Sequence, residues 1–392
     1  MSKASPPQSA ASDRDLRLDL FRGLALWLIF LDHIPENIAN WFTIRNYGFS
    51  DATEIFIFIS GYTAAFVYGR TMRDRGFVLA SARILRRAWQ LYVAHIFLFT
   101  IFMAEIAYVA ATFDNPLYAE EMKILDFLKQ PDITIFQALL LKFKPVNMDV
   151  LPLYIVLLLV FPPVLLLLLR APNVALAGSA IVYAFAWKLD WNLSAYPNGV
   201  WFFNPFAWQL LFVFGAWCAL GGAGRLAGVL HSRGILVVAI VYLVFAFFIT
   251  LTWRFEDLDR FVPGWLKDWM YPIDKTNLDV LRFAHFLALA AVTVHFVPRD
   301  WPALKSPILW PAIVCGQHSL EIFCLGVFLA FAGQFVIAES SGGPLLQTGI
   351  SVLGILAMIA TANLISWYKG IETRGPVARV KSRDADLAGG EA

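Results

Sequence analysis

The chain consists of long apolar runs separated by short polar or Pro/Gly-rich segments. A helix needs about 20 apolar residues to cross the hydrocarbon core of a bilayer, and its backbone hydrogen bonds are satisfied internally there. The runs have about this length, so the pattern predicts a polytopic helical membrane protein. The ten spans that we expect cover residues 18–34, 53–68, 83–111, 150–169, 174–191, 205–220, 234–252, 278–296, 308–337 and 345–367.

The longest polar interruption, residues 112–148, carries acidic and basic side chains and several prolines. We expect it to form an amphipathic, partly helical excursion outside the membrane. Two further loops, 192–204 and 253–275, are rich in aromatic residues. Aromatic belts at the membrane surface would give this composition, and sugar stacking is the alternative interpretation.

Lys and Arg residues indicate the cytoplasmic ends of the spans, because cytoplasmic loops are enriched in both. Arginines cluster between 70 and 87, and a basic tail covers 369–383. The sequence therefore predicts an all-α bundle of about ten transmembrane helices with both termini cytoplasmic. We expect the membrane domain over residues 14–370, a disordered N-terminal tail over 1–13 and a C-terminal tail over 371–392.

Composition supports the membrane assignment. Hydrophobic residues make up 59% of the chain and charged residues 15%, with a mean hydropathy of +0.64, which excludes a soluble protein. The net charge of +2 says little about partners. Cys218, Cys315 and Cys324 all lie in apolar runs without a disulfide or metal spacing. We expect no metal and no nucleic-acid partner, and the oligomeric state stays open.

The first span carries the clearest candidate chemistry. Arg22 and His33 are eleven residues apart, so they share one helix face about 16 Å apart along the axis. An ionisable residue inside a membrane segment is costly and indicates function, and a neutral imidazole can act as a base near pH 7. The alternatives are a headgroup anchor for Arg22 and a structural helix cap for His33. Asp32 could orient the ring, although adjacent helical residues point about 100° apart.

A second candidate site is the arginine cluster at the start of span three. Arg83, Arg86 and Arg87 follow three arginines between 70 and 75, and none of the six is a lysine. Arginine suits forked contacts with phosphate, so we expect a phosphorylated cytoplasmic cofactor to bind here. The alternative is that the cluster only marks the cytoplasmic side. Ser60 and Gly61 in span two could leave room for a narrow cofactor arm, or serve helix packing alone.

Residues of other spans and loops are candidates for contact with a second substrate. Asp279, Arg282 and His285 fall at three-residue spacing, and we expect Asp279 to pair with Arg282. His318 lies inside span nine, at helical spacing from an acidic residue. The full set of candidate substrate-binding residues is Glu54, Asp149, Trp201, His318 and Glu321.

Several of these motifs together resemble a known family. The Arg22 to His33 spacing, the Ser60-Gly61-Tyr62 sequence and the Arg-rich start of span three resemble the integral-membrane acyltransferases called acyltransferase type three. Four runs are similar to its OpgC branch, which adds succinyl groups to osmoregulated periplasmic glucans. These runs are DLFRG at 19–23, NMDVLPLY at 147–154, FAWQL at 206–210 and HFLA at 285–288.

The resemblance implies a protein of the bacterial inner membrane that takes succinyl-CoA from the cytoplasm as donor and a periplasmic glucan as acceptor. His33 would match the essential histidine of the family and Arg22 the arginine on the CoA side. Whether His33 acts as a general base or carries the acyl group stays open. Two alternatives are an acetyl-CoA-dependent enzyme acting on another carbohydrate and a transporter or flippase.

Transfer across the membrane also sets an expectation about geometry. If the nucleotide binds at the arginine cluster, the pantetheine arm must follow span one towards His33. We therefore expect a continuous tunnel from the inner face to His33, with Ser60 and Gly61 as its opposite wall. A Gly61→Leu change should then block the donor without unfolding the bundle.

Overall fold

The computed structural model describes residues 15–35, 37–113, 120, 122–340 and 342–374. These residues form helices and connecting loops without a β-strand, so the all-α prediction is confirmed. The predicted tails, 1–13 and most of 371–392, lie outside the described residues, and α17 extends to Arg374.

The first half of the described chain contains α1 Leu16–Asp32, η1 Ile38–Phe42, η2 Ile44–Asn46, α2 Ala52–Arg75, α3 Phe77–Phe113, α5 Leu125–Lys129, α6 Pro131–Leu139, α7 Val150–Arg170 and α8 Pro172–Leu189. The second half contains α9 Pro205–Trp217, the π-helical turn η3 Cys218–Gly222, α10 Ala223–Leu230, α11 Arg233–Thr252, α12 Glu256–Asp259, α13 Gly264–Met270, α14 Val280–Phe296, η4 Pro302–Lys305, α15 Trp310–Gln317, α16 Ser319–Ala338 and α17 Pro344–Arg374.

Seven helical segments of the described chain are long and apolar enough to cross a membrane. They comprise α2, most of α3, α7, the continuous segment from α9 to α10, α11, α16 and most of α17, while α14 is apolar but shorter. The chain is therefore a helical membrane protein. The total of about ten spans and the side of each terminus stay predictions.

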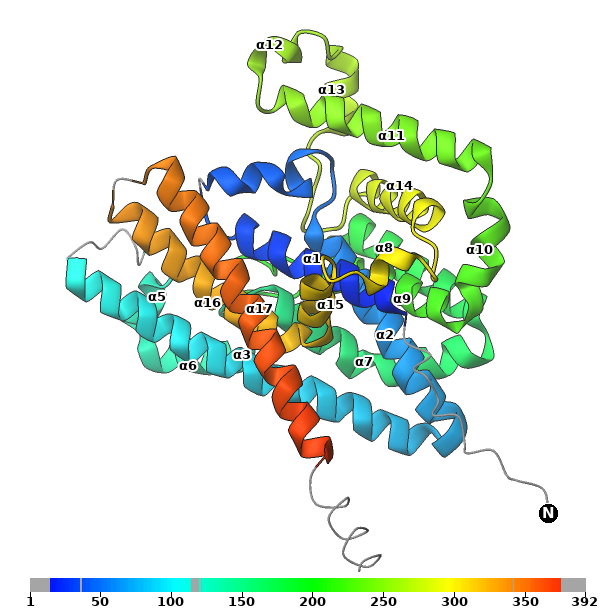
Figure 1. Cartoon of the computed structure of the whole chain (residues 1–392), viewed down its shortest axis with the longest axis horizontal. Helices are drawn as coiled ribbons and strands as arrows, with labels where there is room; N and C mark the ends of the chain where they lie inside the picture. Colours follow the sequence, from blue (N-terminus) through cyan, green and yellow to red (C-terminus); the bar gives the residue numbers. More distant parts are fainter. Residues whose placement is uncertain (1–14, 36, 114–119, 121, 341, 375–392) are drawn as a thin grey trace, which may run out of the picture.

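Helix α1 lies in the middle of the bundle, with α11, α12 and α13 along one edge and α3, α5 and α6 on the opposite side (Figure 1). It packs most extensively on α15 and also contacts α2 and α16. The backbones of α1 and α15 approach closely at Gly23 and Gly316. A Cβ atom at Gly23 would lie 1.8 Å from the Ala312 carbonyl oxygen, so only glycine fits this crossing.

One span differs from its predicted form, and another ends where it was predicted to end. Span nine is not one helix, because the backbone at His318 leaves the helical region, with φ −114° and ψ 42°, and separates α15 from α16. Span six reaches its Gly-rich turn, where the backbone of Leu220 and Gly221 is not helical and Gly221 has a φ of +108°. The chain then continues as α10.

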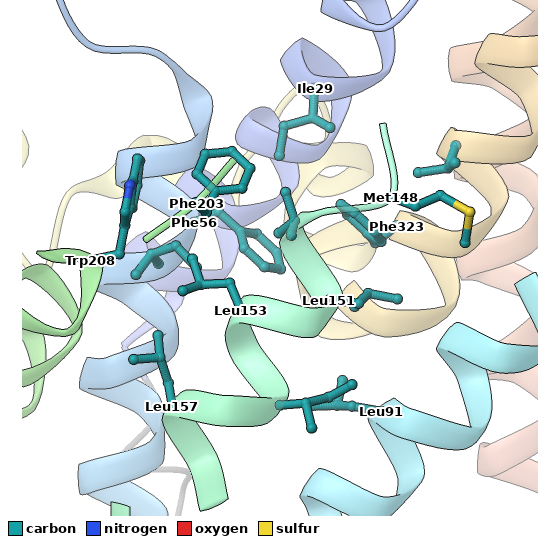
Figure 2. Packing of buried hydrophobic residues seen from close by; sticks show 14 of the residues in the cluster. Ile29, Phe56, Leu91, Met148, Leu151, Leu153, Leu157, Phe203, Trp208 and Phe323 are labelled. Atoms are coloured by element: carbon teal, nitrogen blue, oxygen red, sulfur yellow. The ribbon is translucent and has the colours of Figure 1, made fainter. Parts of the chain in front are cut away.

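The interior between α1, α2, α7 and α16 is apolar. Phe56, Leu153 and Phe323 are buried side chains from α2, α7 and α16 that pack in one layer (Figure 2). The ring centroids of Phe56 and Phe323 are 5.9 Å apart. We refer to these three residues as the apolar layer, because it lies between two cavities of the bundle that are described below.

Candidate functional site

A cavity of about 850 Å³ opens where the end of α1 meets the beginnings of α2, α7 and α14. We call it the outer cavity, because it lies at the helix ends that the sequence predicts to face outward. Polar and apolar groups share its lining about equally, and aromatic rings cover part of the wall. The polar and aromatic lining residues used below are Asp32, His33, Arg45, Ser50, Asp51, Phe49, Lys142, Phe143, Lys144, Asp149, Tyr196, Phe202, Phe203, Arg254, Lys275 and Arg282.

His33 caps the C-terminal end of α1 and lines the outer cavity. Its Nδ1 atom lies 2.7 Å from the carbonyl oxygen of Ile29. A carbonyl oxygen can only accept, so Nδ1 carries the proton and Nε2 keeps its lone pair. No hydrogen bond to Nε2 is formed by the described residues. The ring is therefore both a helix cap and a base with an unused acceptor nitrogen.

Asp32 shares the outer cavity with His33, but Ile29 rather than Asp32 orients the His33 ring. Its Oδ1 atom is buried and has no hydrogen-bond partner among the described residues. Leaving a buried carboxylate oxygen without a partner is costly, which is a property of functional sites more often than of structural ones. A catalytic role for Asp32 stays a prediction.

A group of four charged residues, three buried and one partly exposed, holds the beginning of α2 against α14. Glu54 and Asp51 form a capping box at the N-terminus of α2. Arg282 Nη2 lies 2.6 Å from Glu54 Oε1 and 3.1 Å from Asp51 Oδ2, and Lys275 Nζ lies 2.5 Å from the same Asp51 oxygen. Burial alone would raise the pKa of Asp51, but Lys275 and Arg282 together hold this pKa well below its ordinary value.

These ion pairs change the interpretation of two predicted residues. Glu54 is fully buried and is not among the residues that line the outer cavity, so it positions α2 in this structure. The spacing predicted that Asp279 would pair with Arg282, but the two residues form no ion pair in this structure. Asp279 caps α14 instead, accepting a 2.8 Å hydrogen bond from the Leu281 N–H, because the first helical N–H groups lack partners within the helix.

His285, one turn beyond Arg282, also bonds to the segment before α2. Its Nδ1 atom accepts from the Ser50 N–H at 3.3 Å and lies 2.7 Å from Ser50 Oγ. Because Nδ1 accepts from a backbone N–H, it is the unprotonated nitrogen of this ring. The predicted polar face of α14 is thus turned towards the residues that precede α2.

On the opposite wall, Asp149 lies at the beginning of α7 and faces the outer cavity. Lys144 Nζ lies 3.9 Å from Asp149 Oδ1 and 3.7 Å from the centroid of the Trp201 ring. Burial raises the pKa of Asp149 to about 6 and lowers that of Lys144 to about 8. Trp201 is 3% exposed and stacks on Lys144, so the predicted sugar-stacking face of this ring is covered. Phe143, Tyr196, Phe202 and Phe203 supply the aromatic lining.

A second, smaller cavity of about 110 Å³ lies near the other end of α1, and we call it the inner cavity. Its lining includes Arg22, Ser60 and Arg87, three residues that were predicted to bind the phosphorylated cofactor. The Arg22 guanidinium donates to the Thr63 hydroxyl at 2.6 Å and to the Ile59 carbonyl at 3.1 Å. Ser319, the first residue of α16, also lines this cavity.

Other residues predicted for the cofactor lie elsewhere. Arg83 donates to the Thr71 hydroxyl at 3.2 Å, and the exposed Arg86 does not line the inner cavity. Gly61 faces α9, where an added Cβ would lie 2.0 Å from the Phe212 carbonyl oxygen. The hypothesis that Gly61 forms a wall opposite α1 is therefore wrong, because its α-carbon is in close contact with another helix.

His318 and Glu321 are not brought to Asp149. His318 Nε2 lies 2.7 Å from Ser366 Oγ, and Lys369 Nζ lies 3.8 Å from Glu321, both contacts being near the end of α17. The beginning of α17 instead contacts the segment that follows α1, through Ser351. Ser351 and Ser366 are about 22 Å apart along the helix, so the predicted substrate set is divided between two ends of the bundle.

The two cavities have no lining residue in common. Along α2, Phe56 of the apolar layer lies between Thr53 of the outer cavity and Ser60 of the inner cavity. Along α7, Leu153 lies between Val150 and Tyr154 in the same way. The continuous tunnel that was expected from the sequence would have to join these two cavities, and it stays a prediction. Helix α1 extends from one cavity to the other, because Arg22 lines the inner cavity and His33 lines the outer cavity.

Several cavity residues were not predicted. Ser50, Lys144 and Lys275 lie in loops, and Arg45 lies in the short 3-10 helix η2. Neither periodicity nor a motif singles out residues in such segments. Asp51 could have been found, because an acidic residue three positions before Glu54 is the signature of a capping box.

Comparison with known proteins identifies the family. A family model described as OpgC protein matches residues 14–370, which is nearly the whole chain. No curated protein and no solved structure matches the chain. With its helical membrane architecture, the chain belongs to the OpgC family, a family of membrane acyltransferases of glucan modification.

Proposed function

We propose that this protein is a membrane O-acyltransferase that moves a succinyl group from cytoplasmic succinyl-CoA to a hydroxyl of a periplasmic glucan. The observation that carries the proposal is the hydrogen bond that fixes the His33 tautomer, because it leaves the Nε2 lone pair unused on a ring that lines the outer cavity. A sugar hydroxyl is a weak nucleophile until a base removes its proton, and a neutral imidazole is suited to this step near pH 7.

The shape and lining of the outer cavity support a carbohydrate acceptor. Its volume of about 850 Å³ can hold several sugar rings, and its wall combines aromatic rings with charged and amide groups. Asp32 lines this cavity, and its carboxylate is a candidate acceptor for a hydrogen bond from a sugar hydroxyl. Asp149 offers a second carboxylate on the opposite wall.

The inner cavity supports a phosphorylated donor. Arg22 and Arg87 converge there with Ser60, and the N-terminus of α16 adds a favourable dipole for an anion. The cavity is too small for a whole CoA molecule, so we infer that it receives part of the donor. The acyl arm would then have to displace the apolar layer in order to reach His33.

The direct test is incubation of the purified protein with isotope-labelled succinyl-CoA and a neutral glucan, followed by mass analysis of the sugar. Addition of a labelled succinyl ester supports the proposal. Acetyl-CoA serves as the parallel donor, because an acetyltransferase acting on a carbohydrate is the alternative enzyme. Absence of acyl transfer from either thioester would overturn the proposed reaction.

A further inference from the structure

Two arginines of the outer cavity, Arg45 and Arg254, have no carboxylate partner among the described residues. Arg254 is held by the Asn46 side chain and the Trp41 ring, which leaves Arg45. Lys275 and Arg282 are paired with Asp51 and Glu54, as described above. Lys144 is near Asp149. Arg45 faces the same cavity, and no carboxylate of the described residues lies within ion-pair distance of it.

The backbone that carries Arg45 is held firmly. Arg45 lies in η2, and the next residue, Asn46, donates to the Asn40 carbonyl at 2.6 Å and accepts from Arg254. Further along, Ser50 is bonded to His285. The contacts of Asn46 and Ser50 hold the backbone next to Arg45 and so restrict the positions that its guanidinium can reach. This restriction lowers the entropy cost of binding a ligand there.

Arg45 is also close enough to His33 for its charge to act on the ring. Lys275 and Arg45 are two cations whose charges act on both His33 and Asp32. Lys275 is committed to Asp51 at 2.5 Å. Arg45 is therefore the cation that is available to an anionic group placed next to the base.

We propose that Arg45 forms the binding site for the free carboxylate of a dicarboxylic acyl group during its transfer. This inference rests on the proposed function and adds the origin of acyl selectivity. A guanidinium binds a carboxylate through two parallel hydrogen bonds, and a buried carboxylate without such a partner pays a large desolvation cost. An acetyl group has no second carboxylate and gains nothing from Arg45.

Arg45 takes no part in bond changes. In the transfer, the bond between the acyl carbon and the CoA sulfur breaks, and an ester bond to the sugar oxygen forms. The hydroxyl proton passes to Nε2 of His33 and finally to the CoA sulfur, so charge and atoms balance. Arg45 selects the acyl group by holding its far end, while His33 acts at the reacting end.

The test is a competition between equal concentrations of succinyl-CoA and acetyl-CoA, with the full-length protein, a neutral glucan and mass analysis of both esters. Arg45→Gln should lower the ratio of succinyl to acetyl product by roughly ten- to a hundredfold, as expected for loss of a charged hydrogen-bonded pair. The acetyl rate should change much less than the succinyl rate, because an acetyl group makes no ion pair with Arg45. Arg45→Lys keeps the charge and should retain part of the selectivity.

Lys142→Gln is the matched control, because Lys142 is another exposed cation of the same cavity, and its product ratio should equal that of the wild type. An equal loss of both products in Arg45→Gln would overturn the inference, since this is the result expected if Arg45 only balances the charge of Asp32. An unchanged ratio would also overturn it. Failure of the proposed function gives a different result, namely no ester from either donor with the wild-type protein.

Discussion

At the scale of single residues, the hydrogen bond between His33 and Ile29 determines which ring nitrogen can act. We predict that His33→Ala lowers kcat by roughly 10²–10⁴-fold, the range in which general-base catalysis contributes. Fold and insertion should be retained, because the change removes only the side-chain part of the α1 cap. The measurement is the initial rate of ester formation, with thermal unfolding as a check on the fold.

His231 provides a control with the same local geometry. It caps α10, and its Nδ1 lies 2.8 Å from the Ala227 carbonyl oxygen, but it lines neither cavity. His231→Ala should therefore keep the wild-type rate. Near-normal turnover by a folded His33→Ala enzyme would remove His33 from the mechanism.

Two neighbouring arginines allow a sharp test of the donor site. Arg87 lines the inner cavity, whereas Arg86 is exposed and does not. We predict that Arg87→Gln weakens CoA binding about tenfold, since a charge-assisted contact with phosphate is lost, and that Arg86→Gln leaves it unchanged. Titration calorimetry with CoA measures both. Equal behaviour of the two variants would mean that the cluster only marks membrane sidedness.

Asp149 gives a prediction about pH, because burial raises its pKa to about 6 from the ordinary value of 3.8. Between these values the folded protein binds more protons at this site than the unfolded chain does. The stabilising contribution is thus fully present below pH 3.8 and is lost as the pH rises through 6. Asp149→Asn cannot ionise, so its Tm relative to that of the wild type should increase by a few degrees from pH 4 to pH 7. A constant difference in Tm would contradict this prediction.

At the scale of helices, close crossings depend on glycine. An added Cβ at Gly61 would lie 2.0 Å from the Phe212 carbonyl oxygen, so α2 and α9 would have to separate. We predict that Gly61→Ala destabilises the bundle by about 1–3 kcal/mol, as other over-packed sites do. From the sequence we expected Gly61→Leu to block donor binding without unfolding the bundle. The close contact with α9 predicts instead that this variant is destabilised.

The comparison for Gly61→Ala is Gly178→Ala in α8, where no atom lies within 4 Å of the added methyl group. Its Tm should be unchanged or slightly raised, since alanine has the higher helix propensity. Thermal unfolding in one detergent compares both variants. A Gly61→Ala protein as stable as the wild type would show that the crossing can relax at little cost.

The sequence predicted the helices well, because hydropathy and length decide where a chain can cross a bilayer. It did not predict the break at His318, since one residue with non-helical φ and ψ leaves the surrounding hydropathy unchanged. It also missed the pairing of Arg282 with Glu54, which are 228 positions apart. Local spacing favoured Asp279 as the partner of Arg282, but tertiary packing decided the pair.

At the scale of the whole molecule, the outer and inner cavities are separate, and Phe56 and Leu153 lie between them along α2 and α7. Phe56, Leu153 and Phe323 are buried and nonpolar, so these side chains make no directional bonds. Such a layer can be displaced by a thin pantetheine chain while it still excludes water and ions. The apolar layer thus fits a protein that must keep its membrane sealed between turnovers.

This separation predicts that the two substrates react only from opposite sides of the membrane. In sealed proteoliposomes with one protein orientation, selected by protease accessibility of the C-terminal tail, succinyl-CoA should be active only on the side of the tail and of Arg87. The glucan should be active only on the side of the outer cavity. Ester formation is measured with each substrate supplied inside or outside, in all four combinations. Because His33 faces the outer cavity and Arg22 the inner one, we expect product in only one of the four. Efficient transfer with both substrates on one side of an intact membrane would show that the donor reaches His33 without passing the apolar layer.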